Sequence, residues 1–206
     1  MAPPLPLDRN SGAALTLDHE EHDIHEGNAF TFHYQSEAPL PTAIGAETAV
    51  GFTTPTAAQS SKLIHMTVAA IADDESTFEI REAPAITPNQ GTDAGPINRF
   101  RPVVVPSELR DNQTPIGDDS LTTYTVLEAA AANLAAVGAV LHSETLAVGG
   151  AAPFASVENA AVRGEKEWVL APGTDYVVIL TNLTVNDTTH HITLNWSESE
   201  PADYVS

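Results

Sequence analysis

The sequence predicts an all-β fold, a jelly-roll-like antiparallel β-sandwich, in a chain of 206 residues. Three observations lead to this prediction. Short runs of alternating apolar and polar residues recur along the chain, which is the period of a half-buried strand. Pro, Gly, Asn and Asp residues end these runs as turns. The chain also lacks a convincing long amphipathic helix, so about nine to eleven short strands account for the pattern.

We expect one domain. A proline-rich arm at residues 1–12 precedes a β-sandwich over residues 13–200, and residues 201–206 form a tail. The start of the chain has no basic segment followed by an apolar core, so it does not favour a cleaved signal peptide. A domain of this length can bury a core without crosslinks, and the absence of cysteine excludes disulfides and thiolate zinc sites.

The first half of the chain is expected to hold strands at residues 13–18, 29–35, 47–53, 62–68 and 78–86. In the second of these, Phe30, Phe32 and Tyr34 share one face. The acidic pair Asp73–Asp74 is interpreted as a hairpin-type turn, so the strands on either side of it would form a β-meander.

Residues 87–120 differ from the rest because they are rich in proline and contain Arg99, Arg101 and Arg110. We expect a long excursion with at most a short strand at 103–105, since loops of this length are usually functional or interfacial. A strand at 121–128 follows. Residues 129–136 could form a short helix, but an irregular or strand conformation is favoured because β-branched residues and glycines follow.

The last segment is predicted to be three consecutive strands. A run from Trp168 to Leu170 stops at the turn Pro172–Gly173. Residues 176–180, beginning at Tyr176, are apolar on both parities, which predicts a strand with both faces covered. In the final run Ile192, Leu194 and Trp196 point one way, which is typical of a half-buried edge of the same core.

The charge of the chain is strongly acidic. Its 28 acidic and 8 basic residues give a formal net charge of −20, which makes nucleic-acid binding very unfavourable. The scarcity of lysine, with only Lys62 and Lys166, resembles proteins of hypersaline organisms, although an ordinary acidic surface would give the same signal. We expect molar salt to stabilise the protein, because the Debye length falls to about 3 Å at 1 M. No segment has the ~20 apolar residues of a membrane helix.

A dense polar stretch at residues 18–26 contains His19, His22 and His25, whose imidazoles could ligate a transition metal. Their three-residue spacing argues against it, because on a strand they would alternate faces. We therefore predict that His22 and His25 bond backbone or carboxylate partners, and that Gly27 adopts a positive φ at the entry to the next strand. No cofactor motif is present. Of the four glycosylation sequons, Asn186 and Asn112 are better acceptors than Asn182 and Asn195, which fall in or beside strands.

Several segments together resemble a known group of proteins. They are His22-x-x-His25-x-Gly27 before an aromatic strand, the predicted meander ending Phe78-Glu79-Ile80, the segment from Pro96 to Arg101, Trp168-x-Leu170-x-Pro172-Gly173-Thr174-x-Tyr176, Leu180-Thr181-Asn182, and Leu194-x-Trp196. Their order resembles that in the head or capsid-decoration proteins of tailed viruses. These viruses are phage-like, and the acidity of the chain is compatible with a haloarchaeal host. The resemblance implies a β-sandwich on the outside of an icosahedral shell, usually a homotrimer, with no catalytic residue.

Three function classes compete. The first is a virion structural protein on the outer capsid surface, a homotrimer bound to the major capsid protein, with no enzyme activity, cofactor, nucleic acid or membrane partner. The Arg99, Arg101 and Arg110 cluster would then contact an acidic protein neighbour, unless these arginines pair within the chain. The second is a receptor-binding or fibre-tip module of the virion. The third is a cupin-like metalloenzyme, for which His65, His142, His190 and His191 could supply further ligands.

Overall fold

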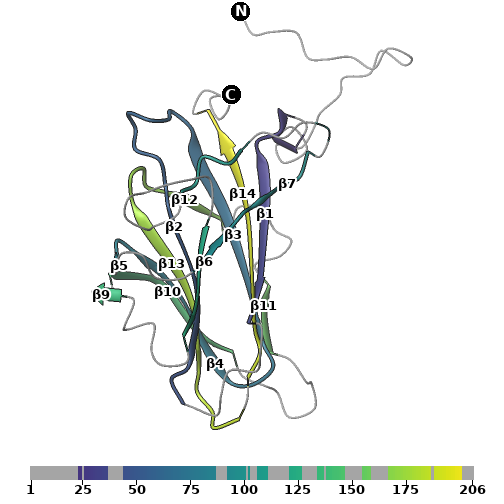
Figure 1. Ribbon diagram of the computed structural model, residues 1–206, viewed down its shortest axis with the longest axis vertical. Coiled ribbons are helices and arrows are strands. Elements are labelled where there is room, and N and C mark those ends of the chain that lie inside the picture. The colour runs from purple at the N-terminus through teal and green to yellow at the C-terminus, as the bar shows by residue number, and fades with distance from the viewer. Residues whose placement is uncertain are drawn as a thin grey trace, which may run out of the picture.

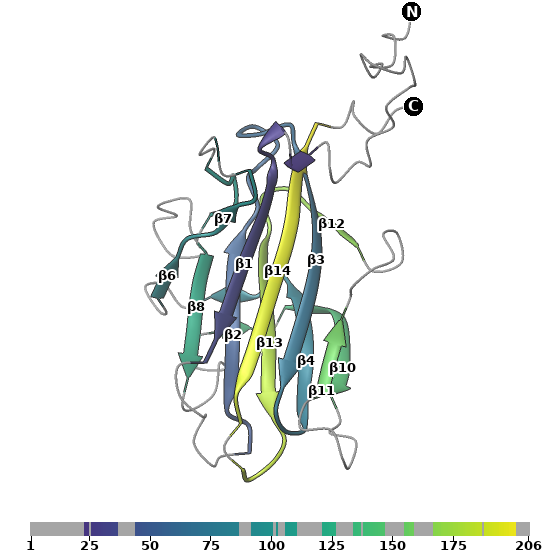
Figure 2. The same cartoon turned by 90° about the vertical axis from the view of Figure 1, so that its right-hand side faces the viewer.

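The computed structural model describes residues 23–24, 26–36, 44–86, 92–100, 102, 106–110, 121–126, 134–136, 138–146, 155–158, 167–186 and 188–200. In this part the chain forms two antiparallel sheets that face each other, so the predicted all-β sandwich is confirmed (Figures 1 and 2). The predicted strand at 13–18 and the residues His22, His25 and Arg101 lie outside the described residues.

The first sheet has six strands in the order β11-β3-β14-β1-β7, with β12 also paired to β3. These strands are β1 (Ala29–Gln35), β3 (Leu63–Ala72), β7 (Ile97–Asn98), β11 (Ala155–Glu158), β12 (Trp168–Leu170) and β14 (His190–Ser199). Its centre is the long β3–β14 pair, in register from Leu63 opposite Ser199 to Ala72 opposite His190.

The second sheet also has six strands, in the order β10-β4-β13-β2-β8-β6. These are β2 (Glu47–Thr53), β4 (Ser76–Glu82), β6 (Thr92–Ala94), β8 (Leu121–Val126), β10 (Ala139–Leu146) and β13 (Asp175–Asn182). A separate two-stranded sheet pairs β5 (Ala85–Ile86) with β9 (Leu134–Ala136). The described end of the alanine-rich segment is therefore a strand, as favoured.

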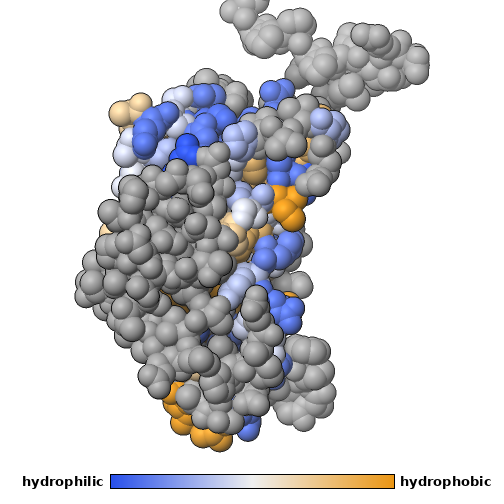
Figure 3. All heavy atoms as spheres, viewed as in Figure 1, coloured by the Kyte–Doolittle hydropathy of each residue, from blue (hydrophilic) through white to orange (hydrophobic). Residues whose placement is uncertain are grey.

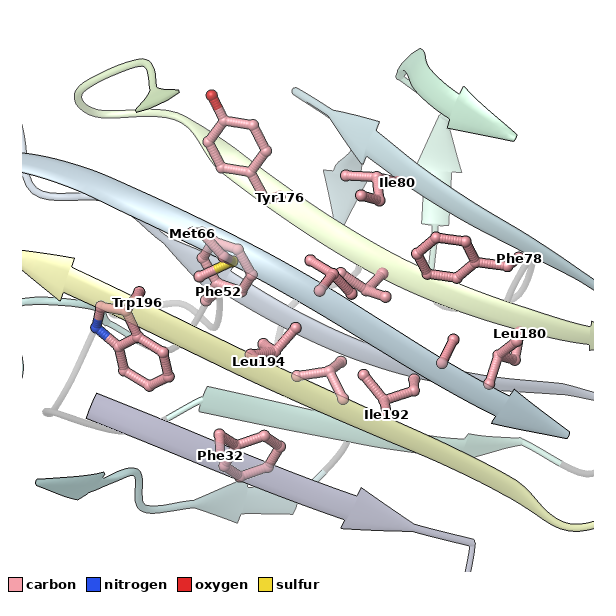
Figure 4. Packing of buried hydrophobic residues seen from close by; sticks show 14 of the residues in the cluster. Phe32, Phe52, Met66, Phe78, Ile80, Tyr176, Leu180, Ile192, Leu194 and Trp196 are labelled. Carbon is pink, nitrogen blue, oxygen red and sulfur yellow. The ribbon is translucent and has the colours of Figure 1, made fainter. Parts of the chain in front are cut away.

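The core lies between the two sheets (Figure 4). Alternate residues of each central strand point inward, so β3 shows a strict alternation of buried and partly exposed positions. Ring pairs lie near one end of the core, with Phe30 stacked on Trp196 at 5.6 Å and Phe52 on Tyr176 at 5.7 Å between centroids. Such contacts add to the burial of the rings themselves.

The two last long strands differ in what covers them. Tyr176 to Leu180 in β13 are all buried, which confirms that both faces of this strand are covered. The inward side of β14 is also as expected, with Ile192, Leu194 and Trp196 in the core. However, β14 is not an edge strand, because β1 and β3 pair with its two sides.

The prediction of a hairpin at Asp73–Asp74 is wrong. The strand before the turn, β3, belongs to the first sheet, and the strand after it, β4, belongs to the second. The turn therefore carries the chain across the core. Val68 in the first sheet and Phe78 in the second both point into the same hydrophobic cluster. Each strand hides its apolar face in this way, whereas a hairpin would leave both apolar faces on one side of a single sheet.

The excursion at 87–120 is more ordered than expected. The excursion contributes β6 to the edge of the second sheet and β7 to the edge of the first. The short strand predicted at residues 103–105 lies outside the described residues. Arg110 then forms a bridge to Thr53 in β2. The excursion thus passes from one sheet to the other along one side of the sandwich. The sequence does not predict this path, because strands as short as β6 and β7 leave no long alternating run of residues.

Candidate contact surfaces

The end of the sandwich where β14 finishes, called here the cap end, is built around the buried carboxylate of Glu198. Its Oε1 atom accepts hydrogen bonds from Ser107 Oγ at 2.6 Å, Glu108 N at 2.9 Å and Trp196 Nε1 at 3.1 Å. Burial raises the pKa of Glu198, and the three hydrogen bonds oppose that rise. The network ties the excursion to the core and serves a structural purpose.

Two of the predicted arginines, Arg99 and Arg110, lie at the cap end but bond to different sheets. The Arg99 N–H donates to Ala29 O in the first sheet, and Arg110 exchanges backbone hydrogen bonds with Thr53 in the second. Arg99 is exposed and Arg110 is partly exposed. Arg99 and Arg110 thus lie at one end of the molecule, each held by its backbone to a different sheet.

The entry to β1 matches the prediction for Gly27, whose φ is +78°. Its N–H donates to Ile24 O, and its carbonyl accepts from Asn98 Nδ2 at 2.7 Å. Asp23 and Ser199 add a buried hydrogen bond of 3.0 Å at the same place. The segment before β1 is therefore fastened to β7 and to the end of β14.

The predicted turn at Pro172–Gly173 is also present. Gly173 has φ of +62° and donates its N–H to Pro55 O. Tyr176, just beyond the turn, donates its hydroxyl proton to Glu82 at 2.7 Å and accepts one from Ala171 N, and burial raises the pKa of the phenol. Trp168 packs against the core from the preceding strand. These residues support the fold and form no reactive group.

His190 lies fully buried at the other end of the core, called here the tip end. Its Nε2 is 3.1 Å from Ser76 Oγ, its Nδ1 is 3.1 Å from Thr48 Oγ1, and its N–H donates to Ser36 Oγ. Burial lowers its pKa to about 4, against a smaller opposing effect of the Asp73 charge, and His191 lowers it further. The neutral imidazole thus links the two sheets.

The outward positions of β1, β14 and β3 hold no Asp, Glu, Lys or Arg, and together they form a surface called here the open face. The carboxylate of Glu167 lies at its edge, 3.5 Å from His65 Nδ1. Figure 2 looks onto these three strands. The outward positions follow from the register with the buried ones. They are Thr31, His33, Gln35, His65, Thr67, Ala69, Ile71, His191, Thr193 and Asn195.

Hydrogen bonds between neighbouring strands order the open face. Thr31 Oγ1 donates to Asn195 Oδ1 at 2.8 Å, and His33 Nδ1 lies 3.0 Å from Thr193 Oγ1. The exposed Ile97 in β7 flanks Thr31 on the same side. The second sheet offers no such surface, because its outward residues Ala49, Val177 and Ile179 are buried. Sequence reasoning missed the open face, although the outward positions predicted within residues 29–35, 62–68 and 191–196 already lacked Asp, Glu, Lys and Arg.

Within the described residues, no group of three or more His, Cys, Asp or Glu side chains could hold a metal ion. The metalloenzyme alternative therefore gains no support there, and His19, His22 and His25 lie beyond those residues. In the same described part, no helix is long and apolar enough to span a membrane.

Comparison with known proteins found no match to a protein family, to a curated protein or to a solved structure.

Proposed function

We propose that this chain is a structural protein of a tailed virus that decorates the outer surface of an icosahedral capsid, as a homotrimer on the lattice of the major capsid protein. The order of strands supports the architecture. We interpret β1-β14-β3-β11 facing β2-β13-β4-β10 as the two sheets of a jelly roll, into which β5 to β9 are inserted. Jelly rolls occur in viral capsid proteins, but also in lectins and cupins, so the fold alone does not decide the function.

The open face carries the proposal. Interface cores are depleted in charged residues, and here the outward positions of three neighbouring strands hold no Asp, Glu, Lys or Arg in a chain whose formal net charge is −20. Copies of so acidic a protein repel each other wherever their charges meet. An uncharged, hydrogen-bonded sheet surface lets neighbouring copies pack closely, as a decoration protein repeated around a symmetric shell must do.

The exposed Arg99 and the partly exposed Arg110 at the cap end support a second contact, to which the sequence adds Arg101. Arginine is scarce in this chain, and an acidic neighbour is its natural partner. In the proposed trimer this neighbour is an adjacent acidic copy. Replacing Arg99 and Arg101 by Glu is therefore expected to weaken trimerisation or shell attachment while leaving the fold intact.

The test compares the native mass of two single-charge variants in molar salt. Asn195→Asp keeps the shape of the side chain and its acceptor for Thr31, but it places a negative charge in the open face. Ala57→Asp adds the same charge at an exposed turn and is the matched control. We expect Asn195→Asp to weaken trimer association by about tenfold or more and the control to leave it unchanged. Equal association of both variants, or a monomeric wild type, would contradict the proposal.

A further inference from the structure

The loop between β13 and β14 turns large aliphatic side chains outward. Leu183 and Val185 are 38% and 64% exposed, and Ile44 beside them is 66% exposed. The two segments are neighbours, because Gly45 N donates to Asn182 O at 2.8 Å. Hydrophobic side chains gather at the lower end of the molecule in Figure 3, where Figure 1 shows this loop. We call Ile44, Leu183 and Val185 the apolar tip.

Hydrogen bonds of the polar side chains of the same loop fix its shape. Asn182 Oδ1 accepts a hydrogen bond from Thr184 N at 2.8 Å, and Asn182 Nδ2 donates to Asn186 O at 3.0 Å. Asp74 Oδ2 accepts from Asn186 Nδ2 at 2.6 Å, and Leu183 N donates to Glu75 O. The exposure of the aliphatic residues is therefore held by a hydrogen-bonded loop, so little conformational entropy would be lost when they bind a partner.

A single exposed aliphatic residue needs no explanation, but three on two neighbouring segments indicate an interaction site. The acidic residues Asp73, Asp74 and Glu75 lie at the base of the tip, since Leu183 N bonds Glu75 O and Thr189 N bonds Asp73 Oδ1 at 2.6 Å. Hydrogen bonds from Asn186 and the backbone lower the pKa of Asp74, which keeps its charge. An apolar pocket edged by Arg or Lys complements this surface, whereas an anionic lipid surface repels it.

We propose that the apolar tip inserts into an apolar pocket, edged by basic side chains, on the major capsid protein. This inference rests on the proposed function and adds which end of the molecule faces the shell. The ten residues of β14 separate the tip from the cap end, so Arg99 lies at the end of the molecule away from the shell. The open face runs between the two ends and is free for contacts among copies.

The experiment uses virions from which this protein has been removed, and measures how the full-length chain rebinds to them. Val185→Asp places a charge at the tip, and Val185→Thr replaces a methyl group by a hydroxyl of similar size. Val140→Asp is the matched control, because Val140 in β10 is 49% exposed and lies away from the tip. We expect Val185→Asp to weaken rebinding by at least about tenfold, Val185→Thr by several-fold, and the control to bind as the wild type does.

The charges at the base of the tip are tested by Glu75→Lys, which leaves the backbone carbonyl that holds Leu183 in place. We expect it to weaken rebinding several-fold, and unchanged rebinding would overturn the basic edge of the pocket.

The outcomes separate this inference from the proposed function. If the wild type rebinds and Val185→Asp rebinds equally well, the tip is not the shell contact, whereas the proposed function stands. If the wild type neither rebinds nor occurs in virions, both fail. If the wild type binds phosphatidylcholine vesicles and Val185→Asp does not, the tip binds lipid. If Val185→Asp changes the native mass of the purified protein, the tip binds a second copy. Binding of the tip to lipid or to a second copy would overturn the inference.

Discussion

The buried His190 makes the stability of this protein depend on pH in a direction that the structure fixes. Burial lowers the pKa of His190 from 6.5 to about 4, so the folded state disfavours its protonated form. Between pH 4 and pH 6.5 the unfolded chain binds a proton at His190 that the folded chain does not. The free energy of unfolding therefore falls as the pH drops from 6.5 to about 4, and this loss of stability is absent above pH 6.5.

The size of the effect follows from the shift. One pKa unit corresponds to about 1.4 kcal/mol, so a pKa lowered from 6.5 to about 4 costs roughly 3 kcal/mol of stability at pH 4. This exceeds a typical single hydrogen bond and is a large part of the stability of a small domain. Since His190 links Thr48 in the second sheet to the first sheet, we expect its protonation to loosen the tip end first.

The assay is urea unfolding in molar salt at several values between pH 4 and pH 7, for the wild type and for His190→Gln. Gln does not titrate, and its amide can donate to Ser76 and accept from Thr48, which replaces both side-chain partners of the ring. Other groups titrate alike in both proteins, so the difference between the two curves isolates His190. We expect the wild type to lose about 3 kcal/mol more than the variant between pH 7 and pH 4. Parallel curves would refute the reasoning.

Two further predictions concern the buried carboxylate and a tight turn. Glu198→Ala leaves three hydrogen-bond donors without their acceptor and should cost about 3 kcal/mol in urea unfolding, whereas Glu198→Gln keeps an acceptor and should stay within about 1 kcal/mol. Because the pKa of Glu198 is raised, the wild type should lose stability relative to Glu198→Gln as the pH rises through that value, and the opposite trend would contradict a buried carboxylate. Gly138→Ala should cost about 2 kcal/mol or more, because φ is +66° and the new Cβ would clash with the backbone oxygen of Glu82. Gly95→Ala, with open space around it, should be nearly neutral, and equal costs for the two variants would contradict this account.

The sequence predicted strands better than it predicted their partners. Alternating residues showed which side of β1 and β3 is buried, because the burial of alternate side chains leaves a period of two in the sequence. The same pattern cannot say which strand lies beside which, so the turn at Asp73–Asp74 was interpreted as a hairpin although it crosses between sheets. The position of β14 at the centre of its sheet depends on pairings with residues more than a hundred positions away.

The candidate surfaces were only partly predictable for a related reason. Arg99 stood out by its rarity, and the Gly27 conformation followed from its place before a strand. The apolar tip did not stand out, because Leu183 and Val185 alternate with polar residues as a strand would. Only the structure shows that buried Asn182 holds the loop by hydrogen bonds while the aliphatic side chains point outward.

The central claim is that this chain is a repeated component of a virion, and the composition of purified particles tests it most directly. Quantitative mass spectrometry of virions, together with native mass measurement of the purified protein in molar salt, gives both the ratio of this chain to the major capsid protein and its oligomeric state. The account predicts a fixed ratio to the major capsid protein and a trimeric mass. Absence from purified virions and a monomeric mass would contradict it.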